Sequence, residues 1–338
     1  MTTKEYILNA LRESPDAPVS GASMSRSLNL SRNAIWKTIE TIKTEGYEIE
    51  TIGKRGYLLK SDANVLTQAQ ISSLLNVKKH NLLPVRRLVS STNKKAKSMA
   101  LRGEAEHGTI LVANAQHRGQ GRFGKTFVSP ANHGIYISFI LDAAELPFNI
   151  PTLITPYAAV AVSEAIEETC KKSPVVKWVN DIFLDGKKIC GILAEIVQNT
   201  KISDKTWIIL GIGINVTPAK EHEKFPNVIG SIFDCDANDL PVTRNEIAAA
   251  VINRILNINY KQATIIEKYR QRLFIIGKKI RIVGDLSETP QKKRHTLTEE
   301  PKIQYVTVKD VTSTGELLVE TETGEIKTLV AGEISLDI

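Results

Sequence analysis

The stretch Gly119-Gln120-Gly121-Arg122-Phe123-Gly124 fits the pattern G-x-G-x-x-G, which joins a strand to a helix in a dinucleotide-binding fold. Here the apolar runs at 109–113 and 135–141 predict a strand on each side, and no helical pattern follows the glycines. Pyrophosphate would therefore find no helix N-terminus at this turn. The stretch predicts a long glycine loop between two strands instead.

This loop is positively charged. Residues 114–127 contain no Asp or Glu and carry Arg118, Arg122 and Lys125. Backbone N–H groups and guanidinium groups in such a loop can enclose an anion. An isolated glycine-rich loop is more often a mobile hairpin with incidental charges, so the rest of the sequence has to decide between the two interpretations.

The loop belongs to a central region of mixed structure. Strand candidates alternate irregularly with helical patterns, which predicts an α+β domain. The strand candidates are 109–113, 135–141, 175–178, 189–196 and 207–215, and the helical patterns are 93–101, 157–171 and 243–256. After Gly277 the pattern changes to short alternating strands, at 279–283, 305–308, 316–319 and 325–329. These predict a small β-barrel with a long polar loop at 286–301.

The N-terminal residues predict a winged helix-turn-helix. Thr3 can cap a first helix, a second helix fits 21–28, and Ser31 can cap a third. Ile35, Ile39 and Ile42 recur at helical spacing in the third helix. Alternating strands at 47–52 and 57–59 around a basic turn would form the wing. We therefore expect a multidomain α+β chain, divided at 1–63 (winged helix), 64–84 (linker, with a helix at 67–75), 85–275 (central domain) and 276–338 (barrel).

A helix-turn-helix reads base edges with the first turn of its second helix. The residues expected to contact DNA lie in that helix, before it, and at the wing tip: Arg26, Ser31, Arg32, Asn33, Trp36, Lys37, Lys54 and Arg55. Residues 1–60 carry nine basic and seven acidic side chains, so the basic residues are clustered rather than abundant. A winged helix that contacts proteins, or that has lost DNA binding, is the alternative.

Composition excludes several classes of protein. The chain has 338 residues, 42% hydrophobic and 24% charged, which is typical of a folded globular protein. Its net charge of +7 permits a polyanionic partner. The longest apolar stretch, 150–166, contains Pro151, Pro156 and Glu164 and does not predict a membrane span. The N-terminus lacks the features of a signal peptide, so we expect a cytoplasmic protein without membrane contact.

The cysteines and histidines predict neither a disulfide framework nor a metal site. Cys170, Cys190 and Cys235 are widely spaced and form no C-x-x-C pair, so we expect small buried hydrophobic side chains. The six histidines show no metal-ligand spacing, and His117 in the loop is expected at the surface.

Five motifs together decide between the interpretations of the loop. In order and spacing the chain resembles the biotin protein ligases, and its two flanking domains resemble the bifunctional subgroup, the biotin operon repressors. The motifs are Ser91-Thr-Asn93, Gln116 with the loop through Phe127, Lys177-Trp-Val-Asn-Asp181, Lys188 with Gly191-Ile-Leu193, and Gly211-Ile-Gly-Ile-Asn215.

The resemblance implies an activity and a fold. Biotin and ATP, with Mg²⁺, would form biotinyl-5′-AMP, and the biotinyl group would pass to a lysine of the carboxyl carrier protein of acetyl-CoA carboxylase or of another biotin-dependent enzyme. Biotinyl-5′-AMP would also act as corepressor for a homodimer on operator DNA of biotin genes. The central domain would be biotin/lipoate-ligase-like and the barrel SH3-like.

The resemblance also implies site residues. Lys188 and Arg122 would be catalytic, because fixed cations can neutralise the two anions that react. The implied biotin-binding residues are Ser91, Thr92, Asn93, Gln116, Gln120, Gly121, Arg122, Lys188 and Gly191. The implied ATP- and adenylate-binding residues are Gly119, Gly121, Arg122, Gly124, Phe127, Lys188 and Asn215.

The chain departs from the family pattern in four places. Gln120 and Lys125 stand where Arg is common, Phe127 where Trp is common, and Val179 where Pro is common. The loss of guanidinium groups would affect adenylate retention first, since Lys does not replace the bidentate contacts of Arg. A biotin-sensing repressor without enzymatic activity and a ligase with a silent DNA-binding domain are therefore alternatives. A lipoate ligase would lack the glycine-arginine loop.

Some of these positions also have plainer interpretations. Lys188 follows a turn at 185–187, where lysines are usually solvated. Asn180 and Asp181 could simply form a turn, and Trp178 and Phe183 are expected in the core. Gly332-Glu333 near the C-terminus resembles a family segment that folds over the nucleotide, although Asp337 stands where a basic residue is common.

Overall fold

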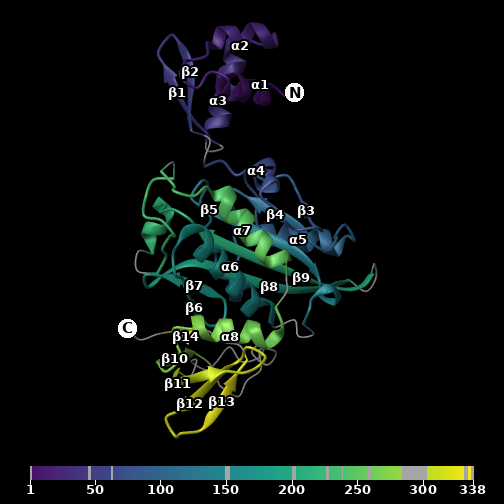
Figure 1. Ribbon diagram of the computed structural model, residues 1–338, viewed down its shortest axis with the longest axis vertical. Coiled ribbons are helices and arrows are strands. Elements are labelled where there is room, and N and C mark those ends of the chain that lie inside the picture. The colour runs from purple at the N-terminus through teal and green to yellow at the C-terminus, as the bar shows by residue number, and fades with distance from the viewer. Residues whose placement is uncertain are drawn as a thin grey trace, which may run out of the picture.

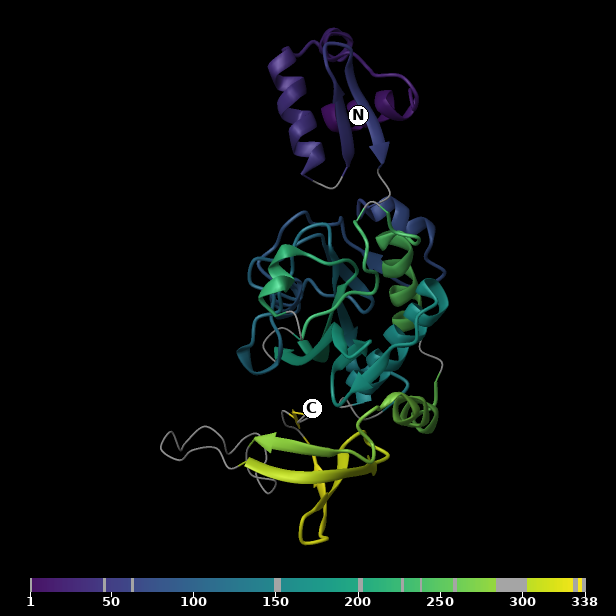
Figure 2. The same ribbon diagram turned by 90° about the vertical axis from the view of Figure 1, so that its left-hand side faces the viewer.

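A computed structural model describes three regions arranged along the longest axis of the molecule (Figure 1). The described residues are 2–44, 47–61, 64–148, 153–199, 203–225, 228–237, 239–257, 260–283, 303–330 and 334–335. A helical domain with a two-stranded hairpin lies at one end, a domain with a seven-stranded sheet lies in the middle, and a five-stranded sheet lies at the other end (Figure 2).

The N-terminal domain has the elements that the sequence predicts. They are α1 (Thr3–Arg12), α2 (Gly21–Leu28), α3 (Arg32–Lys43), β1 (Glu48–Ile52) and β2 (Gly56–Ser61). Ser31 caps α3 as expected, by accepting a hydrogen bond from the N–H of Ala34. The prediction that Thr3 caps α1 is wrong by one residue, because Thr2 forms a capping box with Glu5. Ile35, Ile39 and Ile42 are fully buried in the small core of this domain.

The middle domain is built on one mixed sheet, whose strand order is β3-β4-β5-β9-β8-β7-β6. Its strands are β3 (Asn81–Leu82), β4 (Thr109–Ala113), β5 (Gly134–Asp142), β6 (Val175–Lys177), β7 (Asp181–Leu184), β8 (Lys187–Asn199) and β9 (Ser203–Asn215). Its helices are α4 (Gln68–Ser73), α5 (Thr92–Leu101), α6 (Ile154–Cys170), α7 (Arg244–Leu256) and α8 (Gln262–Arg272). The five strand candidates and the three helical patterns of this domain are confirmed, with shifted ends.

Among the elements that the sequence did not predict, β7 and α8 have identifiable reasons. The strand β7 is only four residues long and pairs with β6 and β8, so its stability comes from neighbours rather than from a local pattern. The helix α8 is polar on most of its surface and has only Ile265, Ile266 and Tyr269 buried. Its packing against α6 and against the strand Ile303–Val311 of the last sheet stabilises it although its own sequence pattern is weak.

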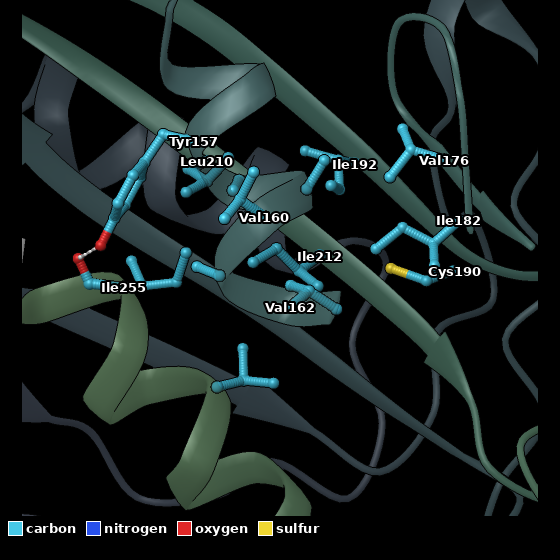
Figure 3. Packing of buried hydrophobic residues seen from close by; sticks show 14 of the residues in the cluster. Tyr157, Val160, Val162, Val176, Ile182, Cys190, Ile192, Leu210, Ile212 and Ile255 are labelled. Atoms are coloured by element: carbon cyan, nitrogen blue, oxygen red, sulfur yellow. Dashed lines mark hydrogen bonds between the residues drawn. The ribbon is translucent and has the colours of Figure 1, made fainter. Parts of the chain in front are cut away.

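The two faces of the sheet differ because side chains alternate along each strand. On β9, Ile208, Leu210 and Ile212 belong to the main core, which α6 and α7 cover. Figure 3 shows Leu210 and Ile212 packed beside Tyr157, Val160 and Val162 of α6. On the opposite face, α5 packs beside Ile209 and Trp207 in a separate apolar cluster. The positions that follow on this face are Gly211 and Gly213, which leaves the end of the sheet uncovered by large side chains.

Helix α6 accounts for the long apolar stretch. It is buried along most of its length between the sheet, α7 and α8. No helix among the described residues is long and apolar enough to cross a membrane. Cys170 at its end and Cys190 on β8 are buried as expected, whereas Cys235 is only half-buried, which corrects the prediction for that residue.

The C-terminal sheet has the strand order β13-β12-β11-β10-β14 and is antiparallel throughout. Its strands are β10 (Lys279–Val283), β11 (Ile303–Val311), β12 (Leu317–Thr321), β13 (Ile326–Leu329) and β14 (Ile334–Ser335). In the described part of the chain this sheet is open, with β13 and β14 at its edges, so barrel closure stays a prediction. The expected polar loop at 286–301 lies outside the described residues.

One buried arginine ties the segment after the winged helix to the middle domain. Arg244 at the start of α7 is fully buried and donates hydrogen bonds to Asn64, to Oδ1 of Asn114 and to the carbonyl of Gly134. Burial lowers its pKa to about 10, so it stays charged at neutral pH although none of these acceptors is a carboxylate. The segment 64–84, which we expected to act as a linker, therefore packs into the core, where Leu66 and Ile71 lie.

We expect Arg244→Leu to destabilise the middle domain by about 3 kcal/mol or more, because it leaves several buried acceptors without a donor. Urea unfolding followed by circular dichroism measures the change. Arg87→Leu is the matched control, since Arg87 is exposed and should change stability by about 0.5 kcal/mol or less. Equal stability of the two variants would contradict the role of Arg244.

Candidate active site

One cavity of the middle domain lies on the face of the sheet that α6 and α7 do not cover. Its volume is about 330 Å³. Among the sequence-predicted residues, those that line it are Ser91, Thr92, Asn93, Gln116, Gln120, Gly121, Arg122, Phe127, Lys188 and Gly191. Residues that are far apart in the sequence, from α5 to β8, therefore meet at one cavity.

One wall of the cavity begins at the N-terminus of α5. Ser91 caps this helix, and the N–H and hydroxyl of Thr92 both donate to Oε1 of Gln116, at 2.8 and 3.2 Å. The Gln116 amide donates in turn to Ser129 Oγ at 3.0 Å. This wall presents hydroxyl and amide groups with no formal charge, which suits a neutral polar ligand.

Asn93 lines the cavity, but its amide is already engaged. Its Nδ2 donates to the carbonyl of Leu193 and to Glu195 Oε2, and its Oδ1 accepts from Ser138 at 2.6 Å. A Cβ at Gly211 would approach Asn93 Oδ1 to 2.1 Å. Asn93 therefore fastens α5 onto the sheet, and the glycine at 211 makes room for it.

The glycine loop closes over the cavity as a short strap. The N–H of Gly121 donates to the carbonyl of Lys125, and the N–H of Phe127 donates to the carbonyl of Gly119. A Cβ at Gly119 would lie 2.3 Å from the Phe127 carbonyl, so only glycine fits there. At the tip, Phe123 and Gly124 both have positive φ, 54° and 74°. The prediction of a glycine loop between two strands is confirmed.

Phe127 lies flat against two glycines of the sheet. Gly191 on β8 and Gly213 on β9 are register partners, and a Cβ at either would approach the Phe127 ring to 2.9 or 2.5 Å. The ring also meets the edge of Tyr136, with 6.4 Å between centroids. Because neither glycine has a side chain, the Phe127 ring can lie close to the sheet and form the floor of the cavity.

Two cations line the cavity, and each has a fixed partner. Lys188 Nζ lies 2.7 Å from Asp181 Oδ1. Arg122 Nη1 donates to Asn180 Oδ1 at 3.2 Å, and Asn180 is itself held by hydrogen bonds to both backbone groups of Ile192. Lys188 is therefore a strand residue with an ion pair, not the solvated turn lysine of the plainer interpretation.

The structure corrects two expectations around these cations and confirms a third. Asp181 begins β7 rather than forming a turn with Asn180. Phe183 is half-buried and lines the cavity instead of lying in the core, whereas Trp178 is buried as expected and also lines the cavity. The indole N–H of Trp178 donates to the carbonyl of Gly315, which ties this wall to the C-terminal sheet.

Gly119, Gly124 and Asn215 do not line the cavity. Gly119 and Gly124 shape the strap from within. The Asn215 amide donates to the carbonyl of Gly230, which fixes the segment that carries Val228 to the cavity wall. The Asn215 Oδ1 atom is buried without a hydrogen-bond partner. Asn215 therefore does not line the cavity itself, but it holds the backbone segment that forms part of the cavity wall.

Several lining residues were not assigned from the sequence. Lys177 and Asn180 belong to the motif at 177–181, so the sequence indicated this segment although it assigned neither residue to the site. Ile334 follows Gly332-Glu333, in the C-terminal segment that resembles a family segment over the nucleotide, whereas Val228 carries no sequence signal, because only the fold brings the segment after β9 to the cavity. Cys190 lies beside Gly191, but burial raises the pKa of its thiol, so it is not a nucleophile. Among the described residues no group of three or more His, Cys, Asp or Glu side chains could hold a metal ion.

Comparison with known proteins assigns the family and the fold. Residues 85–215 match the biotin/lipoate A/B protein ligase family, residues 3–58 match a helix-turn-helix domain, and residues 296–337 match the biotin protein ligase C-terminal domain. The bifunctional ligase/repressor BirA of Bacillus subtilis is 33% identical over 235 residues, which cover 68% of this chain and 70% of that protein.

The chain belongs to the bifunctional biotin protein ligases. The BirA protein of Salmonella typhimurium aligns over 94% of this chain and 92% of its own length, at 29% identity. The structure of the biotin protein ligase from Aquifex aeolicus in complex with biotin and ATP superposes with a TM-score of 0.59 at 25% identity. It covers 75% of this chain and 97% of that one.

The residues that the sequence predicts to contact DNA lie on an accessible surface. The side chains at the start of α3, together with Arg26, Trp36 and Lys37, are exposed, and so are Lys54 and Arg55 between β1 and β2. Trp36 is half exposed although it is large and apolar. This surface lies in the N-terminal domain, at the end of the molecule opposite the C-terminal sheet (Figure 1).

We expect Gly213→Ala to destabilise the ligase by about 1–3 kcal/mol, because the added methyl group overlaps the Phe127 ring. A double-mutant cycle with Phe127→Ala, measured by urea unfolding, tests the contact. The cost of Gly213→Ala should shrink when the ring is absent. Strictly additive changes would show that the methyl group meets something else.

Proposed function

We propose that the cavity binds biotin and the α-phosphate of ATP side by side and joins them as biotinyl-5′-AMP. The observation that carries the proposal is the juxtaposition of a neutral polar wall with two separately anchored cations in one cavity. The neutral wall suits an uncharged cyclic urea, and the cations suit a carboxylate and a phosphate. Both substrates would be needed to occupy the whole site.

Ser91, Thr92 and Gln116 would hold the biotin head group. Asn93 and Gly191 would shape this end, the first by fastening α5 and the second by admitting the Phe127 ring. Gln120 and Gly121 from the strap would cover the bound biotin. Because Oε1 of Gln116 already accepts two hydrogen bonds, its remaining role is to present the hydroxyl groups around it in one orientation.

Lys188 and Arg122 would carry the adenylation step. A biotin carboxylate oxygen attacks the α-phosphorus, the bond to the bridging oxygen breaks, and pyrophosphate leaves. Negative charge accumulates on the phosphorus oxygens, and cations that are already in position stabilise it without reorganisation. Asp181 would orient Lys188, and Asn180 would orient Arg122. Mg²⁺ would arrive with ATP, since it retains mainly phosphate and water ligands.

Phe127 would lie beside the adenine, and Gly119, Gly121 and Gly124 would let the strap approach the phosphate. Asn215 would fix the segment next to the nucleotide. Ile334 of β14 lines the cavity, which supports a C-terminal sheet that closes as an SH3-like barrel near the nucleotide. Gln120 and Lys125 supply fewer guanidinium contacts, so we expect retention of the adenylate to depend mainly on Arg122.

In the second step a lysine amine of the carrier protein would attack the acyl carbon of the adenylate. An amide bond forms, the bond between acyl carbon and phosphate oxygen breaks, and AMP leaves with the electron pair. The acceptor would be the carboxyl carrier protein of acetyl-CoA carboxylase or of another biotin-dependent enzyme. Because the reaction consumes ATP, we assign it to the cytoplasm.

We expect Lys188→Ala to slow adenylate formation at least ~100-fold, because it removes a preorganised cation from the developing charge. Release of pyrophosphate in the presence of biotin and ATP measures this step without the carrier. Lys187→Ala is the matched control, since Lys187 is the exposed neighbour and does not line the cavity. Tight biotin binding without pyrophosphate release by the unmodified chain would favour a biotin-sensing repressor.

Repression would need the adenylate as corepressor. We propose that a homodimer binds a palindromic operator, with α3 of each subunit in the major groove and the wing on the backbone. Ser31, Arg32 and Asn33 would reach base edges, and Lys54 and Arg55 would contact phosphates. The cluster of exposed cations on this surface supports the proposal.

Arg32→Ala should weaken operator binding by about 1–3 kcal/mol while leaving adenylate formation unchanged, because it removes a base or phosphate contact far from the cavity. Gel retardation at two salt concentrations, with and without biotinyl-5′-AMP, measures the effect. Arg12→Ala on α1 is the control substitution. Absence of salt-dependent retardation for the unmodified chain would indicate a silent DNA-binding domain.

A further inference from the structure

The positive charge of the chain is concentrated in one segment. Residues 63–141 contain eleven Lys and Arg side chains and only two acidic ones, Glu104 and Glu106. The segment therefore carries +9, which exceeds the +7 of the whole chain. Arg122 belongs to the proposed catalytic machinery, but most of the other cations have no role in it.

Five of these cations lie close in the chain to Ser91, the cap of α5, or on the loop that bonds to Ser90, and we call them the basic patch: Arg86, Arg87, Lys94, Lys95 and Arg118. All five side chains are exposed, and none of them forms an ion pair with another described residue. Evenly mixed charges are the usual condition of a protein surface, so an unpaired cluster of one sign indicates a partner of the opposite sign.

Backbone hydrogen bonds keep the parts of the patch together. The N–H of Arg118 donates to the carbonyl of Ser90, and the N–H of Asn114 donates to the carbonyl of Arg86. The N–H of Lys95 donates to the carbonyl of Ser91. The patch is thus formed by an extended segment, a loop and a helix start that are fixed to one another, and it needs no rearrangement to meet a partner.

The patch also contains an apolar side chain. Leu88 lies between the two arginines and Ser91 in the sequence and is 59% exposed. Protein interfaces commonly place an apolar anchor within a polar rim, where the rim steers the partner and the anchor is buried. Leu88 is such an apolar anchor, and the cations of the patch form the polar rim.

The patch adjoins the mouth of the cavity. Ser91 and Gln116 line the cavity, and they lie next to Ser90, Lys94 and Arg118 in the chain. We propose that the basic patch, together with the exposed Leu88, is the docking surface for a protein acceptor whose face around the target lysine is acidic. This inference rests on the proposed transfer of biotin to a carrier lysine, because the acceptor must approach this mouth to reach the adenylate.

Two other occupants fit the observations less well. A second copy of the chain, related by a twofold axis, would bring the arginines of one patch against those of the other, and like charges in contact disfavour that interface. Operator DNA is expected at α3, which lies in the N-terminal domain, whereas the patch lies on the middle domain at α5 (Figure 1). An acidic protein surface satisfies both the charge and the position.

The test separates docking from chemistry by using two acceptors with the same full-length enzyme. An apo carboxyl carrier domain needs to dock, whereas hydroxylamine reacts with the biotinyl adenylate as a small neutral molecule. The variant is Arg86→Glu/Arg87→Glu, and Lys94→Glu/Lys95→Glu on α5 is a second variant in case the first folds poorly. Lys172→Glu/Lys261→Glu makes the same change of charge at exposed positions outside the patch.

We expect the patch variants to lower kcat/KM for the carrier domain at least ~10-fold at low salt, chiefly through KM, with a weaker salt dependence than the unmodified enzyme. Their rate of biotinyl hydroxamate formation should stay within twofold, and the control variant should match the unmodified enzyme in both assays. Leu88→Ala should raise KM for the carrier domain without changing the salt dependence.

Three results would overturn the inference. The first is an unchanged kcat/KM for the carrier domain in both patch variants. The second is an equal loss in the control variant, which would reflect net charge only. The third is weaker operator binding with normal transfer, which would assign the patch to DNA. If the unmodified enzyme forms no hydroxamate, the proposed ligase chemistry fails instead, so the two failures are distinguishable.

Discussion

The candidate site depends on the absence of side chains at three positions on one face of the sheet. Gly191, Gly211 and Gly213 lie on adjacent strands, and a Cβ at any of them would overlap Phe127 or Asn93. The strand alternation puts Ile208, Leu210 and Ile212 on the other face, where they pack under α6 and α7 (Figure 3). The same short stretch of β9 therefore supplies both the core and the room for a cavity.

The two cations that line the cavity are held in position before any substrate binds. Lys188 is held by Asp181, and Arg122 is held by Asn180, whose own position is fixed by the backbone of β8. A cation that is already oriented stabilises developing charge more effectively than one that must first be ordered. The neutral wall formed by Thr92 and Gln116 lies in the same cavity, so one site can distinguish an uncharged ring from a carboxylate and a phosphate.

The three regions are connected by specific contacts rather than by free linkers. Arg244 binds Asn64, the first described residue after the winged helix, and also binds Asn114, where β4 leads into the glycine loop. Asn132, near the other end of that loop, accepts from Asn64 and from Asn114. Trp178 contacts Gly315 of the C-terminal sheet. The candidate site is therefore joined by hydrogen bonds to the segment that follows the winged helix and to the C-terminal sheet.

The sequence by itself determined the order of most elements, the cap of α3, the glycine loop and the family, because each of these follows from local spacing or from motifs. Only the tertiary structure decided that Lys188 is paired with Asp181, that Asn93 is engaged by Glu195 and that Phe183 lines the cavity. It also decided that β7 and α8 exist and that Val228 and Ile334 reach the site. The physical reason is that local spacing encodes periodicity, whereas ion pairs, register and cavity walls depend on which distant strands become neighbours.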